Sequence, residues 1–101
     1  FTLYIDGDSK EHEAVLIGGR GTYDAEIGHL IAYDDIQLIN KEGEKLNTEY
    51  LVWSNDSNRV HTNRPVIIES KSGTLEGKGL EADSKFENYR ILKPTGAFEL
   101  P

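Results

Sequence analysis

Short runs of strand-forming residues, each ended by turn formers, are the feature of this sequence that most limits its fold. Val, Ile, Leu, Tyr, Phe and Thr cluster in these runs, and nearly every connection is two to six residues of Gly, Asn, Asp, Ser or Lys, which favours hairpins and meanders. The runs predict strands at residues 1–5, 14–17, 22–25, 30–33, 36–39, 45–53, 59–62, 66–69, 74–82, 88–92 and 97–100.

No window of the sequence has the apolar spacing of a helix. Residues 9–17 come nearest, but their apolar side chains gather at one end and two glycines follow, so we expect a loop that leads into a strand. Pro65 is expected to open the strand at 66–69 and Pro94 to lie in a turn, because a missing N–H costs little at such positions. The chain is therefore predicted to be all-β.

Size and charge restrict the function. The 101 residues suffice for one domain, predicted over 1–101, with a modest core. Eighteen acidic residues against eleven scattered basic ones give a net charge of −7, which disfavours nucleic acid because phosphate binding needs a clustered cationic face. The absence of cysteine excludes disulfides, thiol nucleophiles and thiolate metal sites. No apolar stretch approaches the roughly 18 residues of a membrane span.

An internal repeat of about 29 residues emerges when the strands are aligned. Each repeated unit would have one apolar face, so stacked units are expected to share a continuous core, although chance similarity in a β-rich chain is the alternative. Equivalent apolar positions recur at intervals of 28 or 29 residues in two series, Tyr23, Leu51 and Leu80, and Ile31, Val60 and Tyr89.

Two of the longer strands need bulges if their apolar side chains are to share a face. Side chains alternate along a strand, so Leu46 reaches the face of Leu51 only if a bulge occurs near Tyr50. In the strand at 74–82 the face also switches, and its glycines are typical of a bulge. Strands of this kind bend, as a curved or rolled sheet requires.

Three motifs occur in register with the repeat: KLNTEYLVW (45–53), RVHTNRPV (59–66) and LEGKGLEAD (75–83). Together, and in this order, they resemble the LptC family of lipopolysaccharide-export proteins. Weaker similarity extends the resemblance to residues 19–100, while residues 1–18 carry no matching motif. Trp53 and Ser54 depart from the family pattern, which more often has Tyr and Asp there. The family's amino-terminal membrane helix has no counterpart in this sequence.

The resemblance implies an open, elongated β-jelly roll of antiparallel strands in two facing sheets, whose apolar interior accepts the acyl chains of lipopolysaccharide. It implies a periplasmic domain, tethered to the inner membrane by a segment that this chain lacks. Its implied partners are lipopolysaccharide, a second β-jelly-roll export protein joined by strand addition, and an inner-membrane transporter complex. Catalysis and cofactors are not expected.

Two sets of residues are the candidate sites. Trp53 could be a core residue or part of the wall of a lipid groove. The groove candidates are Leu46, Leu51, Trp53, Val60, Val66, Ile68, Leu75, Leu80, Ile91 and Phe98. The candidates for an unpaired edge that docks a partner are Gly96, Ala97, Phe98, Glu99 and Leu100.

Other chemistry is poorly supported by the sequence. The glycines at 18–21 fit no phosphate-binding fingerprint, and Asp34 and Asp35, like the acids at 6–8, are expected to be solvated turn formers. The Asn-Asp-Ser sequence at 55–57 is interpreted as a hairpin loop rather than a glycosylation site. The histidines lack metal-like spacing, and His61 is expected to point outward, so no metal site is predicted.

Two functions of different classes remain. The first is a non-enzymatic bridge domain that binds acyl chains in an apolar groove, and the alternative is a structural or adhesion β-sandwich with a filled core. A groove should leave a gap along one seam of the interior, whereas a structural sandwich should close it with large facing residues. The sequence does not identify the lipid or the oligomeric state.

Overall fold

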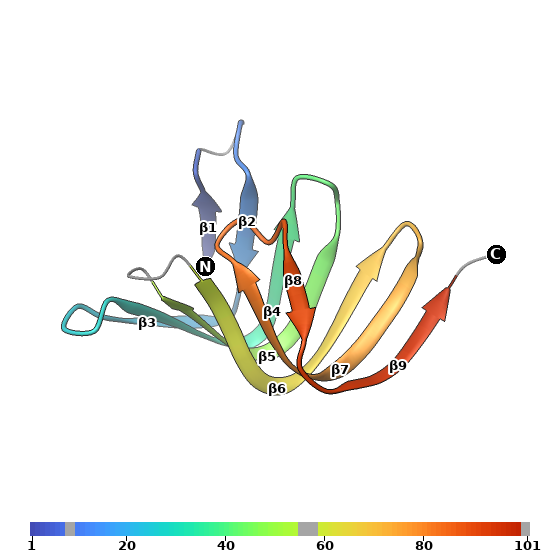
Figure 1. Cartoon of the computed structure of the whole chain (residues 1–101). Coiled ribbons are helices and arrows are strands. Elements are labelled where there is room, and N and C mark those ends of the chain that lie inside the picture. The colour runs from blue at the N-terminus through green and yellow to red at the C-terminus, as the bar shows by residue number, and fades with distance from the viewer. Residues whose placement is uncertain (8–9, 55–58, 100–101) are drawn as a thin grey trace.

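The computed structural model describes residues 1–7, 10–54 and 59–99, and within these ranges the chain forms nine β-strands and no helix (Figure 1). The all-β prediction is confirmed. No described segment is a helix long and apolar enough to cross a membrane. The strands are β1 (Thr2–Ile5), β2 (Ala14–Ile17), β3 (Arg20–Asp24), β4 (His29–Asn40), β5 (Lys45–Ser54), β6 (Arg59–Ser70), β7 (Gly73–Asp83), β8 (Tyr89–Ile91) and β9 (Pro94–Glu99).

All nine strands belong to one antiparallel sheet in the order β1-β2-β4-β5-β6-β7-β8, with β3 paired to β4 and β9 paired to β7. The first part of β4 pairs with β3 and its last part with β2. In the same way, the first part of β7 pairs with β9 and its last part with β8. The sheet therefore consists of two halves, which we call the β3–β8 half and the β1–β9 half after their edge strands.

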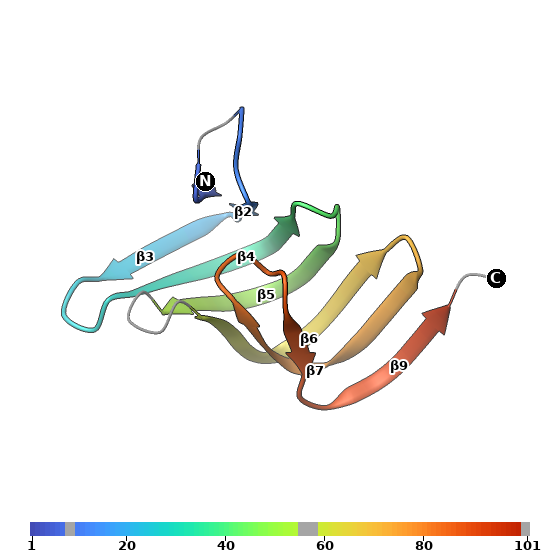
Figure 2. The same ribbon diagram turned by 45° about the horizontal axis from the view of Figure 1, so that its top comes forward.

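The four long strands, β4 to β7, bend where the two halves meet, so that the sheet folds into an open V (Figures 1 and 2). The pairing register shifts at each bend, between Tyr33 and Ile36 in β4, between Thr48 and Val52 in β5, and between Thr62 and Pro65 in β6. The shift in β5 confirms the bulge predicted near Tyr50. The resulting fold is an open β-jelly roll.

Glycine makes the bend of β7 possible. Gly79 has φ +93°, a conformation that residues with a Cβ atom rarely adopt. At Gly77 a Cβ atom would lie 2.9 Å from the backbone oxygen of Lys93, which is too close for an ordinary contact. These two glycines mark the switch of faces that the sequence predicted for this strand.

Three details of the predicted strands are wrong. Residues 30–33 and 36–39 form one strand, and so do 59–62 and 66–69, because a strand can continue through a bulge that shifts its register. Asp34 and Asp35 consequently lie inside β4 with positive φ values rather than in a connecting turn. Pro65 lies within β6 at its register shift, and Pro94 opens the edge strand β9, since both positions tolerate a missing donor.

The 29-residue repeat is not confirmed. Tyr23 is 57% exposed, whereas Leu51 and Leu80, its predicted equivalents, are buried. The first unit also begins with a strand of five residues, while the corresponding β5 and β7 have ten and eleven. The predicted loop at 55–57 lies outside the described residues.

Candidate functional site

The candidate site is the apolar face that the two halves of the sheet share. Paired residues of antiparallel strands point to the same face, so each half presents a row of apolar residues that crosses the strands. The row of the β1–β9 half runs through Leu3, Leu16, Leu38, Leu46, Ile68 and Leu75. The row of the β3–β8 half runs through Leu30, Trp53, Val60, Ala82 and Tyr89.

Six of the ten groove candidates lie in the buried core, with at most 1% of each residue exposed: Leu46, Leu51, Val60, Val66, Ile68 and Leu80. Trp53 and Ile91 are partly buried and pack against this core. Leu75 differs, because it is 37% exposed although it pairs with the buried Ile68 and therefore belongs to the same face. The inner face is thus covered at its centre and accessible near β9.

The remaining candidates lie in or beyond β9. Gly96, Ala97, Phe98 and Glu99 are within this strand, and residues 96–99 pair with residues 73–76 of β7. The side chain of Phe98 is outside the described part of the structure, as is Leu100. The role of this strand as a docking edge therefore stays a prediction.

One loop joins the halves across the mouth of the V, and we call it the clasp (residues 84–88, between β7 and β8). Phe86 is fully buried in the shared core despite its place in a polar loop, and its φ is +56°. Its ring lies 4.8 Å from that of Tyr89, centroid to centroid. The clasp belongs to the β3–β8 half, so Phe86 extends that half's apolar surface toward the opposite one.

Asn40, at the end of β4 in the other half, holds the clasp in place. Its Nδ2 donates to the backbone oxygen of Phe86 at 2.7 Å and to Oε1 of Glu44 at 2.9 Å. Its Oδ1 accepts the backbone N–H groups of Glu42 and Glu44 at 3.1 and 2.9 Å. One buried amide therefore orders the β4–β5 turn and fastens it to the clasp.

Two further contacts connect the β7–β8 hairpin with the β1–β9 half. The Tyr89 hydroxyl donates to Oε2 of Glu44 at 2.7 Å, and Lys85 lies 3.6 Å from the carboxylate of Asp6. Burial, together with the neighbouring Glu44 carboxylate, raises the pKa of Tyr89 to about 12. The phenol therefore stays protonated and keeps donating to Glu44 at alkaline pH values at which an ordinary tyrosine begins to ionise.

Asp83, the last residue of β7, shapes the clasp that follows it. Its carboxylate accepts the backbone N–H groups of Lys85, Glu87 and Asn88 and the side-chain amide of Asn88, at 2.9–3.1 Å. Burial pushes the pKa of Asp83 upward, but these hydrogen bonds outweigh it and hold the pKa below its ordinary value. The stabilisation they provide is present at neutral pH and is lost as the pH falls through that lowered pKa.

Buried threonines explain two of the motifs that carry the family resemblance. Thr48 Oγ1 donates to the backbone oxygen of Pro65 at 3.0 Å, and Thr62 Oγ1 accepts the backbone N–H of Arg64 at 3.1 Å. Both hydroxyls bind backbone groups at the bends, where the register shift interrupts the ladder. The threonines of the first two motifs therefore lie on the line along which the sheet folds.

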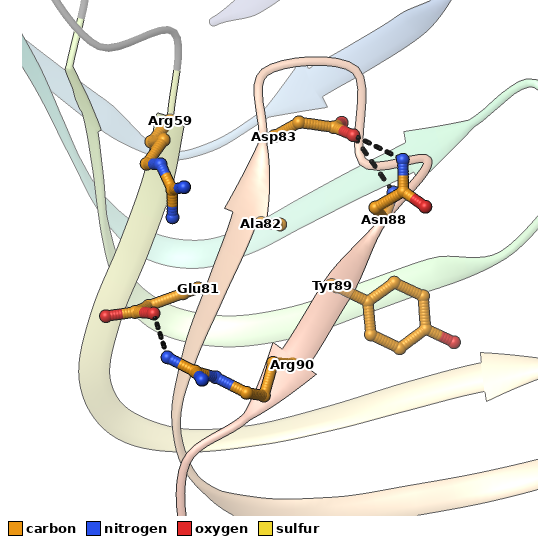
Figure 3. Close-up of a pocket in the computed structure, with 7 residues that line it drawn as sticks. All are labelled: Arg59, Glu81, Ala82, Asp83, Asn88, Tyr89 and Arg90. Carbon is orange, nitrogen blue, oxygen red and sulfur yellow. Dashed lines mark hydrogen bonds and ion pairs between the residues drawn. The ribbon is translucent and has the colours of Figure 1, made fainter.

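A depression of about 550 Å³ lies along the β7–β8 hairpin and is shown in Figure 3. Arg90 forms an ion pair with Glu81 there at 2.6 Å, and Arg59 and Asp83 also line the depression. Two arginines against two carboxylates leave little net charge for an anionic ligand. The depression is lined mainly by polar side chains, together with Ala82 and Tyr89 of the inner row.

A serine and a histidine also lie in contact. Ser54 Oγ is 3.2 Å from Nε2 of His29, its partner in the β4–β5 ladder. Asp24, the partner of His29 on β3, instead uses its carboxylate to accept the N–H of Glu26 at 3.0 Å. The arrangement is therefore a hydrogen bond between strands and not a catalytic triad. His61 is exposed, as predicted, and no cluster of metal-ligating side chains occurs among the described residues.

The sequence does not predict the clasp or its contacts with Asn40 and Tyr89. Tyr89 is predicted only as a member of the repeat, and no motif points to Asn40. Phe86 carried a usable signal, because a large apolar side chain isolated in a polar loop has a reason to be buried. Its partner in the other half could not be inferred, because 46 residues separate Phe86 from Asn40.

Comparison with family models shows which family the chain resembles over nearly its whole length. The family model described as lipopolysaccharide-assembly, LptC-related, matches residues 2–97. The match starts at β1 and so includes the amino-terminal strands, where the sequence showed no motif of the family. Comparisons with curated proteins and with solved structures found no match.

Proposed function

Because the chain belongs to the LptC-related family of lipopolysaccharide-assembly proteins, we propose that it is a non-enzymatic bridge domain that holds lipopolysaccharide acyl chains against its inner face. The family itself implies involvement in lipopolysaccharide transport and is not known as a family of enzymes. The acyl-chain groove is the part of this proposal that goes beyond the family match.

One observation carries the proposal: the inner apolar row of the β1–β9 half runs from fully buried Leu46 and Ile68 to Leu75, which is 37% exposed. An acyl chain laid along this row would extend a continuous apolar surface. Each methylene removed from water contributes about 0.8 kcal/mol, so part of one chain supplies useful affinity. With a net charge of −7, we expect the apolar part of the lipid rather than its phosphates to be bound.

The proposed setting follows from the family. The domain would work in the periplasm, between an inner-membrane transporter complex and a second β-jelly-roll export protein. Among the described strands, the carboxy-terminal edge strand β9 pairs with β7 alone, so we expect its other side to accept strand addition by that protein. Residues 96–100 are the proposed docking edge.

The alternative function is a structural or adhesion β-sandwich. Phe86, which is fully buried between the halves, favours it, because this ring fills interior space that a ligand would need. In that case the exposure of Leu75 would have no role in binding.

A photocrosslinking pair separates these functions. Position 75 and position 67 lie in neighbouring strands with similar exposure, 37% and 41%, but on opposite faces, since Leu75 pairs with buried Ile68 and Ile67 pairs with Glu76. A benzophenone amino acid at position 75 should crosslink to lipopolysaccharide, and the same group at position 67 is the matched control. Equal labelling at both positions, or none at 75, would contradict the groove.

A further inference from the structure

The clasp is fastened to the opposite half by side-chain contacts and not by a strand ladder. Asn40 Nδ2 donates to the backbone oxygen of Phe86 at 2.7 Å. Lys85 lies 3.6 Å from the carboxylate of Asp6, and because the two side chains are 44% and 56% exposed, this ion pair contributes little. Contacts of this kind can be released without unpairing any strand of the sheet.

The clasp is also ordered from within, so it can move as one unit. The Asp83 carboxylate accepts three backbone N–H groups of the loop, and Figure 3 shows its two bonds to Asn88. The ring partner of Phe86 is Tyr89, which belongs to the same hairpin. Releasing the clasp from Asn40 would therefore withdraw the Phe86 ring without breaking the hydrogen bonds that shape the loop.

Phe86 fills interior space next to the inner face. The other members of the described core lie in strands, whereas Phe86 comes from a loop and has φ +56°, which residues with a Cβ atom rarely adopt. Leu46 and Ile68, at the centre of the inner row, are fully buried, so a bound chain reaches them only if a covering element moves. A strand could move only by losing its ladder, but the clasp has no ladder to lose.

We propose that the Phe86 ring occupies part of the acyl-chain site in the free protein and leaves it when a chain binds, and that the opened clasp at the mouth of the V is the way in. This inference rests on the proposed acyl-chain function and adds a step to it. The filled interior and the groove are then two states of one site. Because the clasp must open first, the affinity is lowered in proportion to the fraction of open molecules.

The first test measures the affinity for tetradecanoic acid, below its micelle concentration, by calorimetric titration. Phe86→Ala removes the ring that the chain would displace. We expect it to bind about 10-fold more tightly than wild type, as for a site that is open in about a tenth of the free molecules. Ile36→Ala is the matched control, because Ile36 is also fully buried but lies in β4, outside the clasp. It leaves a cavity without releasing the loop and should bring no such gain.

The second test locks the clasp. The sequence has no cysteine, so the double variant Asp6→Cys, Lys85→Cys has two thiols, placed where the wild-type protein has an ion pair. A bis-methanethiosulfonate with an ethylene spacer joins these thiols through disulfides, and a reductant releases them. We expect the linked protein to bind tetradecanoic acid about 10-fold more weakly than the same sample after reduction.

A third readout keeps the aromatic ring. With para-fluorophenylalanine at position 86, the fluorine resonance should show a solvent isotope shift in the presence of the acid and none in its absence.

The outcomes separate the clasp from the groove. Undiminished binding by the linked protein, equal gains in Phe86→Ala and Ile36→Ala, or a fluorine that stays shielded from solvent in the complex would overturn the role of the clasp. Each of these results leaves the acyl-chain groove standing. If neither the wild-type protein nor any variant binds the acid, the groove itself is overturned, and the role of the clasp with it.

Discussion

Asn40 should be worth more to stability than any exposed asparagine of the sheet. Its side chain is 5% exposed and takes part in four hydrogen bonds of 2.7–3.1 Å. A typical hydrogen bond contributes about 1 kcal/mol, and leaving a buried carbonyl such as that of Phe86 unpaired costs a further 1–3 kcal/mol. Because the Glu42 and Glu44 groups can regain water, we expect Asn40→Ala to lower the unfolding free energy by about 2–4 kcal/mol.

The measurement is urea unfolding followed by the fluorescence of Trp53, the one tryptophan of the sequence. Asn47→Ala is the matched control, because Asn47 lies in β5 on the outer face and its two hydrogen bonds, of 3.0 and 3.3 Å, are exposed. This substitution should lower the unfolding free energy by less than about 1 kcal/mol. Asn40→Asp keeps the acceptor of the β4–β5 turn but replaces the donor with an oxygen that faces the Phe86 carbonyl and the Glu44 carboxylate, so we expect it to destabilise the protein at least as much as Asn40→Ala. If Asn40→Ala and Asn47→Ala destabilise the protein equally, the clasp does not hold the halves together.

Two further predictions concern Tyr89 and β9. The pKa of Tyr89 is raised to about 12 in the folded state, so the stabilisation that its hydroxyl provides is complete below the ordinary tyrosine pKa of about 10 and is lost as the pH rises toward 12. Tyr89→Phe should therefore reduce the fall of the urea midpoint over this pH range relative to wild type. Tyr23→Phe is the control and should not reduce it, because Tyr23 is 57% exposed. Deleting residues 96–101 removes most of a strand that pairs, within the described part of the chain, with β7 alone. Circular dichroism should therefore stay β-type while binding to the export partner in a pull-down disappears. Undiminished binding would rule out this edge, and unfolding would place β9 in the core.

The sequence was informative where local chemistry determines structure. Strand-forming runs located every strand, and the side-chain alternation in β5 required the bulge between Thr48 and Val52 that the structure contains. Alternation also selected Leu46 and Leu51 as neighbours on one face, because only a bulge could bring them together. Each of these predictions depends on residues within a few positions of one another.

Predictions failed where pairing over long distances decides the outcome. A run of residues cannot show whether a strand stops or continues through a bend, so the sequence predicts two short strands in place of β4 and two in place of β6. The exposure of Leu75 depends on its distance from the centre of the folded sheet, which its own strand does not encode. The hydrogen bond that fastens the clasp joins residues 40 and 86, so predicting it requires the complete topology.

The clasp and the accessible end of the inner row lie on different parts of the V, and this asymmetry gives the proposed groove a direction. The clasp joins the β7–β8 hairpin to the β4–β5 turn, whereas the inner row of the β1–β9 half becomes accessible at Leu75 and continues by register to position 97 of β9. A partner strand added to β9 would place its own residue opposite position 97 on the same face. On the proposed function, strand addition would therefore extend the sheet and the acyl-chain surface together, so that the joint between the two proteins is also the path of the lipid.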